Sequence, residues 1–293
     1  MKAKKKILIF GGSGFLGKAF INSIDINNFE VTVADRNNSG INTELVNFVE
    51  VDITSLEAIK SKLNKNYDYV FNFASIADIG EADSNFDKTI DINVSGCLNT
   101  LKFCKSAKIK TYIYASSMYV FGDKGGVYGS TKKISEMLVE RYASEYSFDF
   151  TLLRYGSLYG PGAHDWNSIV KIVKKIKQDK SLTHWGNGNE VREYINIEDA
   201  AKITAQCLDG KFQNQAITIT GQQKYTSREV IEMIFEMLKI KPDIEFLDSY
   251  DGPHYTYTPY TVSPKPSLKV IPTEYIDFSQ GLYDVCISLE DEK

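Results

Sequence analysis

The chain has 293 residues, of which 43% are hydrophobic and 25% are charged, and its formal net charge is −4. These values are typical of a soluble globular protein and exclude a disordered or fibrous chain. The one dense basic run, Lys2 with Lys4 to Lys6, has no aromatic residues interleaved with it, so we expect a solvated terminus and no nucleic-acid partner. Neither a secretory signal nor a run of about eighteen apolar residues is found, which predicts a cytoplasmic protein with no membrane span.

The cysteines and histidines predict no metal site. The four cysteines are scattered without a C-x-x-C pair, and the three histidines lack the spacing of metal ligands. We expect the cysteines to be buried, reduced thiols.

The first half of the chain alternates short apolar runs with longer amphipathic ones. This is the pattern of strands that cross over through helices into a parallel sheet. The predicted strands, each a nearly continuous apolar run, are 7–10, 30–34, 47–50, 69–73, 111–115 and 151–154. The predicted helices lie at 14–24, 55–63, 91–107 and 128–145. The sequence thus predicts an α/β fold with a Rossmann-type, doubly wound parallel sheet.

The regularity weakens after residue 160. The pattern predicts helices at 167–178, near 199 and at 226–238, and a strand at 216–220. Thr226 or Ser227 is expected to cap the helix at 226–238, with Glu229 in its first turn. Five of the seven prolines lie between 253 and 272, which predicts an irregular but ordered cover. We divide the chain into a Rossmann domain at 1–160, completed by segments near 190–220, and a small C-terminal substrate-binding lobe at 161–190 and 221–293.

A glycine-rich turn follows the first predicted strand and opens a helix. Glycines in this context let the backbone turn tightly and approach a pyrophosphate at the helix N-terminus. The residues of this turn that we expect to bind a dinucleotide are Gly11, Gly12, Ser13, Gly14, Phe15, Leu16 and Gly17. Asp35 ends the second predicted strand, roughly twenty residues further on, where an acid can accept hydrogen bonds from the adenosine ribose. Asp35 favours NAD because it would repel a 2′-phosphate, whereas Arg36 could pair with one, so NADP stays the alternative.

Tyr128 and Lys132 are four residues apart and share one face of a predicted helix. An ammonium group near the phenol, together with the positive charge of an oxidised nicotinamide, is expected to lower the pKa of Tyr128 from its usual value of about 10. The tyrosine could then exchange a proton with a sugar hydroxyl or ketone. Ser117 ends a predicted strand at the edge where doubly wound sheets bind ligands, and could hold the reacting oxygen. A chance spacing of the pair and an ordinary strand-end serine are the alternatives.

Eight ordered segments together resemble one known family. They are GGSGFLG, VDI at 51–53, FNFASIA at 71–77, NVSG at 93–96, ASSMYVFG, YGSTK, LRYGSLYGPG and GNGNEVREYINIEDAA. The resemblance is to the extended short-chain dehydrogenase/reductase family, in its NAD-dependent sugar-nucleotide epimerase/dehydratase branch, and its specific motifs cover about residues 7–200.

The resemblance implies roles for individual residues. Ser117, Tyr128 and Lys132 would be catalytic, and Ser117, Ser157 and Arg192 would contact the substrate, with the Arg192 guanidinium clamping its diphosphate. Cofactor contacts would come from Asp52, Ile53, Phe73, Ala74, Ser75, Asn93, Tyr128, Lys132 and Tyr155. The resemblance also implies a homodimer in which the helices that begin near 91 and 128 form a four-helix seam.

The sequence departs from the family pattern near the predicted catalytic residues. The segment from Ser117 to Tyr128 is shorter than usual, which predicts a sugar pocket that is either more open or covered by another segment. Asn196 replaces a frequent histidine, and Ser157 stands where an asparagine is typical. Met118 and Tyr119 occupy the positions where 4,6-dehydratases of the family carry an acid pair, so a dehydratase is not expected.

Three functions remain on the sequence alone. The first is 4-epimerisation of a nucleotide-diphosphate sugar through a 4-keto sugar, with retained NAD. The second is an NAD(P)H-dependent 4-keto sugar-nucleotide reductase or dehydrogenase, which needs the same residues but exchanges its cofactor. The third, of another class, is a catalytically inactive cofactor-sensing protein. The nucleotide and the sugar stay open, because the C-terminal lobe matches the family only loosely.

Overall fold

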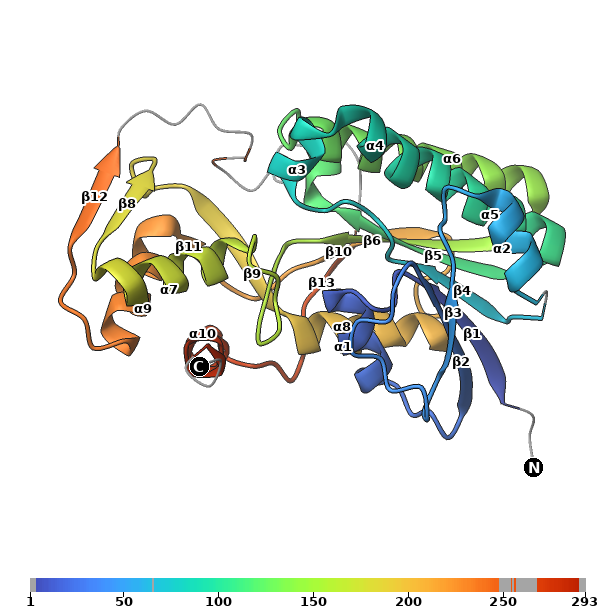
Figure 1. Cartoon of the computed structure of the whole chain (residues 1–293), viewed down its shortest axis with the longest axis horizontal. Helices are drawn as coiled ribbons and strands as arrows, with labels where there is room; N and C mark the ends of the chain where they lie inside the picture. The colour runs from blue at the N-terminus through green and yellow to red at the C-terminus, as the bar shows by residue number, and fades with distance from the viewer. Residues whose placement is uncertain (1–3, 65, 248–253, 255, 257–267, 290–293) are drawn as a thin grey trace.

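The computed structural model describes residues 4–64, 66–247, 254, 256 and 268–289 (Figure 1). Its main feature is an eight-stranded sheet in the order β13-β10-β6-β5-β4-β1-β2-β3, in which every neighbouring pair is parallel. The strands are β1 (Lys5–Phe10), β2 (Phe29–Asp35), β3 (Asn47–Glu50), β4 (Tyr69–Asn72), β5 (Thr111–Ser117), β6 (Asp149–Tyr155), β10 (Gln215–Ile219) and β13 (Leu268–Val270). Because the chain builds outward from β1 and then returns to β1's other side with β4, the strand order reverses between these two strands.

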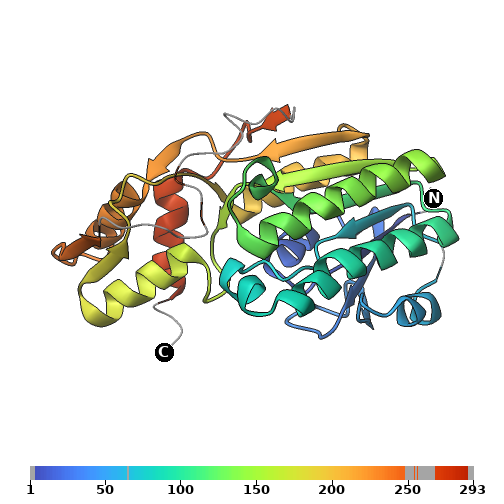
Figure 2. The same cartoon turned by 90° about the horizontal axis from the view of Figure 1, so that it is seen from above.

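Helices cover both faces of this sheet. On one face lie α1 (Phe15–Ser23) and α8 (Ile197–Ala205), and on the other lie α2 (Leu56–Lys62), α5 (Cys97–Ala107) and α6 (Gly126–Tyr146) (Figure 1). Figure 2 shows α5 and α6 side by side above the sheet. Along β1, Ile7 and Ile9 enter the apolar cluster under α1 and α8, whereas Leu8 and Phe10 enter the opposite one. All four are fully buried, which confirms the predicted doubly wound sheet.

Short helices after β4 carry the chain across the sheet edge. They are α3 (Ile79–Ser84), α4 (Phe86–Ile90) and a single π-helical turn at Asp91–Gly96 that leads into α5. The predicted helix at 91–107 therefore consists of two parts with different hydrogen bonding.

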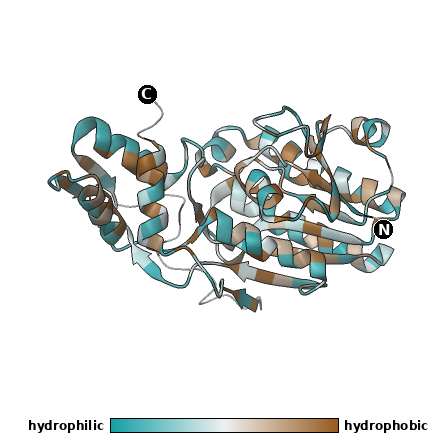
Figure 3. Cartoon of the chain, turned by 90° about the horizontal axis from the view of Figure 1, so that it is seen from below, coloured by the Kyte–Doolittle hydropathy of each residue, from teal (hydrophilic) through white to brown (hydrophobic). Residues whose placement is uncertain are grey.

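A smaller lobe lies beyond β6 and contains two small sheets. One sheet joins β7 (Ser157–Tyr159), β9 (Val191–Asn196) and β11 (Lys224–Thr226), and the other pairs β8 (Leu182–Trp185) with β12 (Ile244–Leu247). Against them pack α7 (Ser168–Asp179), α9 (Ser227–Met237) and α10 (Phe278–Ser288), whose apolar and polar stretches are visible in Figure 3. The predicted cap of α9 is confirmed, because Thr226 and Glu229 form a reciprocal capping box.

The structure changes the predicted division of the chain in one respect. β13 pairs with β10 and so belongs to the large sheet, although we had assigned 221–293 entirely to the lobe. Most of the proline-rich cover predicted between 253 and 272 lies outside the described residues. Within the described ranges, every helix is too short or too polar to cross a membrane.

A buried ion pair ties α6 to the sheet. Nε and Nη2 of Arg154 in β6 each donate to a separate carboxylate oxygen of Glu136 in α6, both at 2.8 Å. Ser116 in β5 donates a further hydrogen bond of 2.6 Å to the same carboxylate. The side chains of Arg154 and Glu136 are 3% and 0% exposed. Because removing two charges from water is costly, such a pair is stable only with geometry of this quality.

We expect the substitution Arg154→Met to lower the free energy of unfolding by about 3–5 kcal/mol, because it removes the guanidinium from a buried carboxylate. The measurement is equilibrium denaturation in urea. Arg141→Met is the matched control, since Arg141 pairs with Glu145 at 3.0 Å on the surface and its side chain is 76% exposed. The control should cost less than about 1 kcal/mol. Equal losses in the two variants would show that the buried pair does not anchor α6.

Candidate active site

The carboxyl ends of β1, β4 and β5 lie next to one another in the sheet, and the predicted site residues follow these ends. The glycine turn follows β1, residues 73–75 follow β4, and Ser117 is the last residue of β5. In open parallel sheets, ligands bind at the carboxyl edge where the strand order reverses. The structure therefore brings three separate stretches of the predicted site to this edge.

The glycine turn packs directly against the loop after β4. Gly11 has a φ of 76°, and a Cβ atom there would lie 2.5 Å from Ala74 N. Gly17, inside α1, could not carry a Cβ either, because it would lie 2.6 Å from Gly12 Cα. The turn therefore requires glycine at both positions. Phe15, the first residue of α1, follows directly from it.

The end of α1 fits a phosphate group. Its N-cap is Gly14, which supplies no side-chain acceptor for the first N–H groups of the helix. The hydroxyl of Ser13, next to it, is buried and has no hydrogen-bond partner within the described residues. Free helix N–H groups and an orphaned hydroxyl are the donors that a pyrophosphate requires. The chemistry of this turn thus matches a dinucleotide.

Asp35 lies beside the same turn. Its Oδ2 accepts a 3.0 Å hydrogen bond from Ser13 N, and its Oδ1 accepts one of 2.7 Å from Arg36 N. A carboxylate has about four lone-pair sites, so these bonds fix its orientation and leave acceptor capacity. Arg36 is exposed just beyond β2.

Asp52 and Ile53 lie after β3. Asp52 accepts hydrogen bonds from the backbone and hydroxyl of Thr54, and Ile53 is buried against Gly96 at the start of α5. Asp52 therefore fixes the turn after β3, and Ile53 packs this turn against the N-terminus of α5.

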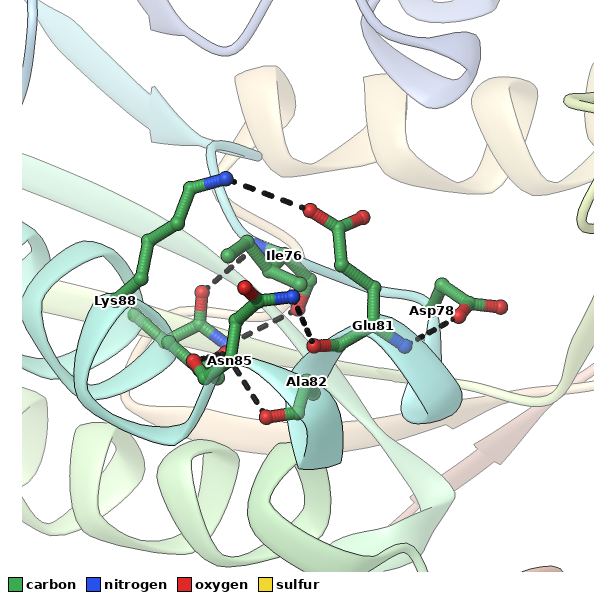
Figure 4. Close-up of polar contacts among 8 residues, drawn as sticks. Ile76, Asp78, Glu81, Ala82, Asn85 and Lys88 are labelled. Atoms are coloured by element: carbon green, nitrogen blue, oxygen red, sulfur yellow. Dashed lines mark hydrogen bonds and ion pairs between the residues drawn. The ribbon is translucent and has the colours of Figure 1, made fainter.

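Asn93 holds the loop after β4 in place. Its Oδ1 accepts from Ile76 N at 2.7 Å, and its Nδ2 donates to Ile76 O and to Thr131 Oγ1, both at 3.0 Å. Figure 4 shows this bonding at Ile76, with Asp78 capping α3 nearby. Asn93 is buried, and its amide is engaged on both atoms. Its position favours a role in supporting loop 73–75 over the predicted direct contact with a cofactor.

Ser117, Tyr128 and Lys132 meet at the end of β5. The Ser117 side chain lies close enough to Tyr128 to favour its phenolate form, and Ser117 Oγ accepts a 3.4 Å hydrogen bond from Tyr119 N. Lys132 Nζ donates to Ala115 O at 2.8 Å and lies 4.9 Å from the centre of the Tyr114 ring and 5.6 Å from that of Tyr128. Two turns of α6 therefore face the last residues of β5, as the four-residue spacing predicts.

Burial dominates the electrostatics of this cluster. It raises the pKa of Tyr128, and the Ser117 side chain opposes this only in part. Burial also lowers the pKa of Lys132 to about 8, although the carboxylate of Glu136 acts in the opposite direction. Lys132 alone does not offset the cost of burying a phenolate, because its ammonium is bonded to a backbone carbonyl. The predicted lowering of the Tyr128 pKa also requires the positive charge of an oxidised nicotinamide and stays a prediction.

Tyr155 lies opposite Ser117 in the β5–β6 register, but its side chain belongs to the core. It is buried, and its hydroxyl lies 2.6 Å from Thr204 Oγ1 of α8. Its surroundings raise its pKa far above the usual range, mainly through burial. These contacts give Tyr155 a packing role, and its place beside a nicotinamide stays a prediction.

The two residues predicted to contact the substrate lie at the beginning of neighbouring strands of the lobe. Ser157 opens β7 opposite Tyr194 of β9, and Arg192 is the second residue of β9; both are partly exposed. Asn196, which replaces a frequent histidine, caps α8 by accepting from Glu198 N at 2.9 Å. It therefore has a structural function here.

Comparison with known proteins agrees with this arrangement. The profile of the NAD dependent epimerase/dehydratase family matches residues 7–219. The chain belongs to the NAD-dependent epimerase/dehydratase family. One curated relative, UDP-glucuronate 4-epimerase of Thermodesulfobacterium geofontis, is 25% identical over 268 residues, which cover 82% of this chain and 83% of the relative.

Solved structures confirm the Rossmann-type fold. UDP-glucose 4-epimerase of Thermotoga maritima with UDP-glucose has a TM-score of 0.84 at 20% identity, covering 98% of this chain and 99% of its own. UDP-glucuronic acid 4-epimerase of Bacillus cereus, in complex with UDP-glucuronic acid and NAD, has a TM-score of 0.80 at 22% identity, covering 97% and 99%.

Within this family fold, sequence reasoning missed one contact beside Tyr128. The hydroxyl of Tyr119 lies 2.5 Å from Nδ1 of His254, and the Tyr119 ring packs edge-on against Tyr128, with centroids 6.1 Å apart. Part of His254 is accessible, yet the surrounding protein and the charge of Arg192 lower its pKa to about 4, so it is neutral at pH 7. Of the two predicted outcomes for the short segment before Tyr128, this contact favours cover by a distant residue.

We expect Gly17→Ala to destabilise the protein by about 1–3 kcal/mol, because its methyl group would overlap the backbone of Gly12. Gly14→Ala is the control. At Gly14 the φ is −76° and the nearest atom, Gly11 O, would lie 3.3 Å from the added Cβ, so we expect a loss below about 1 kcal/mol. Thermal unfolding of both variants measures the difference. A Gly17→Ala variant with the melting temperature of the wild type would show that the turn is not packed this closely.

Proposed function

We propose that this protein is an NAD-dependent 4-epimerase acting on a nucleotide-diphosphate sugar. The observation that carries the proposal is the cluster of Ser117, Tyr128 and Lys132 at the end of β5, beside a glycine turn that suits a pyrophosphate. A proton-transfer group and a dinucleotide site then share one edge of the sheet. Membership of the NAD-dependent epimerase/dehydratase family and the 4-epimerase names of its relatives support the same reaction.

The cofactor would be held by the loops after β1, β2, β3 and β4. We assign the pyrophosphate to the N–H groups of the glycine turn and the adenosine ribose to Asp35. Asp35 favours NAD over NADP because its carboxylate is held toward the turn and would repel a 2′-phosphate. When bound, NAD supplies a hydride acceptor and donor for the sugar carbon and a positive charge in its oxidised form.

Tyr128 would move the proton at the reacting hydroxyl. In its phenolate form it accepts the proton as the carbinol carbon is oxidised, and it returns the proton when the ketone is reduced from the other face. Ser117, whose side chain lies beside Tyr128, would hold the reacting oxygen. Lys132 would place an ammonium 5.6 Å from the centre of the Tyr128 ring, and its charge would favour the phenolate together with the positive charge of the oxidised cofactor.

Arg192 and Ser157 would contact the substrate from the lobe. A guanidinium binds a diphosphate through two parallel hydrogen bonds, and Arg192 lies at the start of β9, close enough to His254 to lower its pKa. Lys171 also lowers the pKa of His254, whereas the carboxylate of Asp78 acts in the opposite direction. The two cations would attract an anionic diphosphate to this part of the site.

We expect the purified wild type to carry NAD and to interconvert the two C4 epimers of a UDP-hexose without added cofactor. Tyr128→Phe should reduce turnover by about 10²–10⁴-fold while NAD binding persists, because only the proton-transfer group is lost. NMR of the sugar measures epimerisation, and acid release measures NAD. The conservative change Lys132→Arg keeps a charge at that position and should be less damaging than Lys132→Met.

Two outcomes contradict the proposal. Stoichiometric consumption of NADPH by a 4-keto sugar nucleotide, without epimerisation, would establish a reductase instead. Unchanged turnover in Tyr128→Phe across nucleotide-sugar assays, with NAD still bound, would support the cofactor-sensing function.

A homodimer and a cytoplasmic location complete the proposal. Large apolar side chains of α4 and α6 are exposed on the outer helical layer: Phe86 at 58%, Ile134 at 40% and Met137 at 62%. Exposed apolar side chains on two neighbouring helices are typical of an interaction site, and a second copy of the chain is the occupant that we propose. The four cysteines are all buried thiols, which fits a reducing compartment.

Met137→Glu should shift the protein toward monomer, because it introduces a charge into the proposed seam. Leu45→Glu is the matched control: Leu45 is 57% exposed but lies in the loop before β3, away from α6. Sedimentation velocity at several concentrations measures both variants. A monomeric wild type, or equal dimerisation of the two variants, would eliminate the seam.

A further inference from the structure

The loop between β7 and α7 carries two exposed aromatic rings to the glycine turn. The ring of His164 lies 6.4 Å from that of Phe15, centre to centre, in an edge-on contact with an interplanar angle of 66°. Trp166 stacks on His164, with the ring centres 5.4 Å apart and an interplanar angle of 18°. Phe15 is the first residue of α1, so this stack lies against the helix end assigned to the pyrophosphate.

The loop is held at both ends. Asn167 caps α7 by accepting from Ile169 N at 3.1 Å, and its Nδ2 donates to Leu158 O of β7 at 2.9 Å. Asp165 pairs with Lys174 of α7 at 2.8 Å. At the other end, Gly160 has a φ of 145° and no room for a Cβ atom, which would lie 2.8 Å from Ile197. The position of the aromatic stack is therefore defined by contacts with both the lobe and the large sheet.

Packing within the protein does not account for the stack. Trp166 is 41% exposed, and neither Trp166 nor His164 belongs to the three apolar clusters formed by the described residues. A tryptophan offers a large apolar surface, which is usually buried when it is fixed in place. Ser13, two residues before Phe15, supplies the independent sign of a ligand here, because its hydroxyl is buried without a partner in the described chain.

We propose that His164 and Trp166 form an aromatic cover on the dinucleotide site that slows the release of NAD. This inference rests on the proposed function. Epimerisation requires the reduced cofactor to stay bound until the hydride returns to the same sugar, whereas a reductase must release it. Loops that close a site commonly set the rate of ligand release. A cover anchored on the lobe and touching the first residue of α1 provides that delay.

The test measures cofactor release directly. NADH is bound to the protein and chased with excess NAD, and the loss of NADH fluorescence gives the dissociation rate. We expect His164→Ala and Trp166→Ala to release NADH at least about tenfold faster than the wild type, and to lose NAD during gel filtration. Trp166→Phe preserves an aromatic ring and should restore slow release.

Trp185→Ala is the matched control. Trp185 is the other tryptophan of the chain and is 69% exposed on β8, so its loss should leave the dissociation rate unchanged. If wild-type protein binds and retains NAD but His164→Ala and Trp166→Ala release NADH at the wild-type rate, the cover is refuted while the epimerase survives. If the wild type binds neither NAD nor NADH, the proposed function fails, and the cover with it.

Discussion

The buried pair of Glu136 and Arg154 determines how α6 meets the end of β5. Three residues of α6 spaced four apart face three consecutive residues of β5: Lys132 bonds Ala115, Glu136 bonds Ser116, and Tyr128 lies beside Ser117. Of these three residues of α6, Glu136 is also bonded to a second strand, through Arg154 of β6. Burying both charges is costly, but the alignment they impose brings the other two contacts into register.

The same burial sets the charge state of the proposed catalytic pair. It raises the pKa of Tyr128 and lowers that of Lys132 to about 8, so the pocket disfavours both the phenolate and the ammonium. A positive charge placed beside the phenol has the opposite effect on its pKa, and in a poorly solvated pocket that effect is large. The proton-transfer group thus becomes a competent base mainly when a positively charged ligand lies next to it. This dependence ties the chemistry to occupancy of the dinucleotide site.

The sequence was informative where structure is local. Strands β1, β2, β4, β5 and β6 are mostly apolar runs that the large sheet buries, whereas β3 at the sheet edge is only partly buried. The glycine turn needs only seven consecutive residues, so it and these strands could be predicted. The strands of the lobe are short and partly buried, and β8 pairs with β12 about sixty residues away, so neither period nor length identifies them. The contact of Tyr119 with His254 spans 135 residues and left no local pattern. For Tyr155, the family resemblance implied a place beside the nicotinamide, and no local pattern indicated the contact of its hydroxyl with Thr204 of α8.

These distant contacts explain how a short segment before Tyr128 is compatible with an enclosed site. The segment between Ser117 and Tyr128 is too short to cover the proposed site by itself. Side chains from distant parts of the sequence lie there instead. His254 contacts Tyr119 on the side proposed for the substrate, and His164 contacts Phe15 on the side proposed for the cofactor. The lobe is attached to α8, which packs on the large sheet, because Ile276 N donates to Asp199 at 2.8 Å. In the proposed function, enclosure of both ligands would depend on the docking of the lobe rather than on one loop, and mutations at that junction should affect the binding of both ligands together.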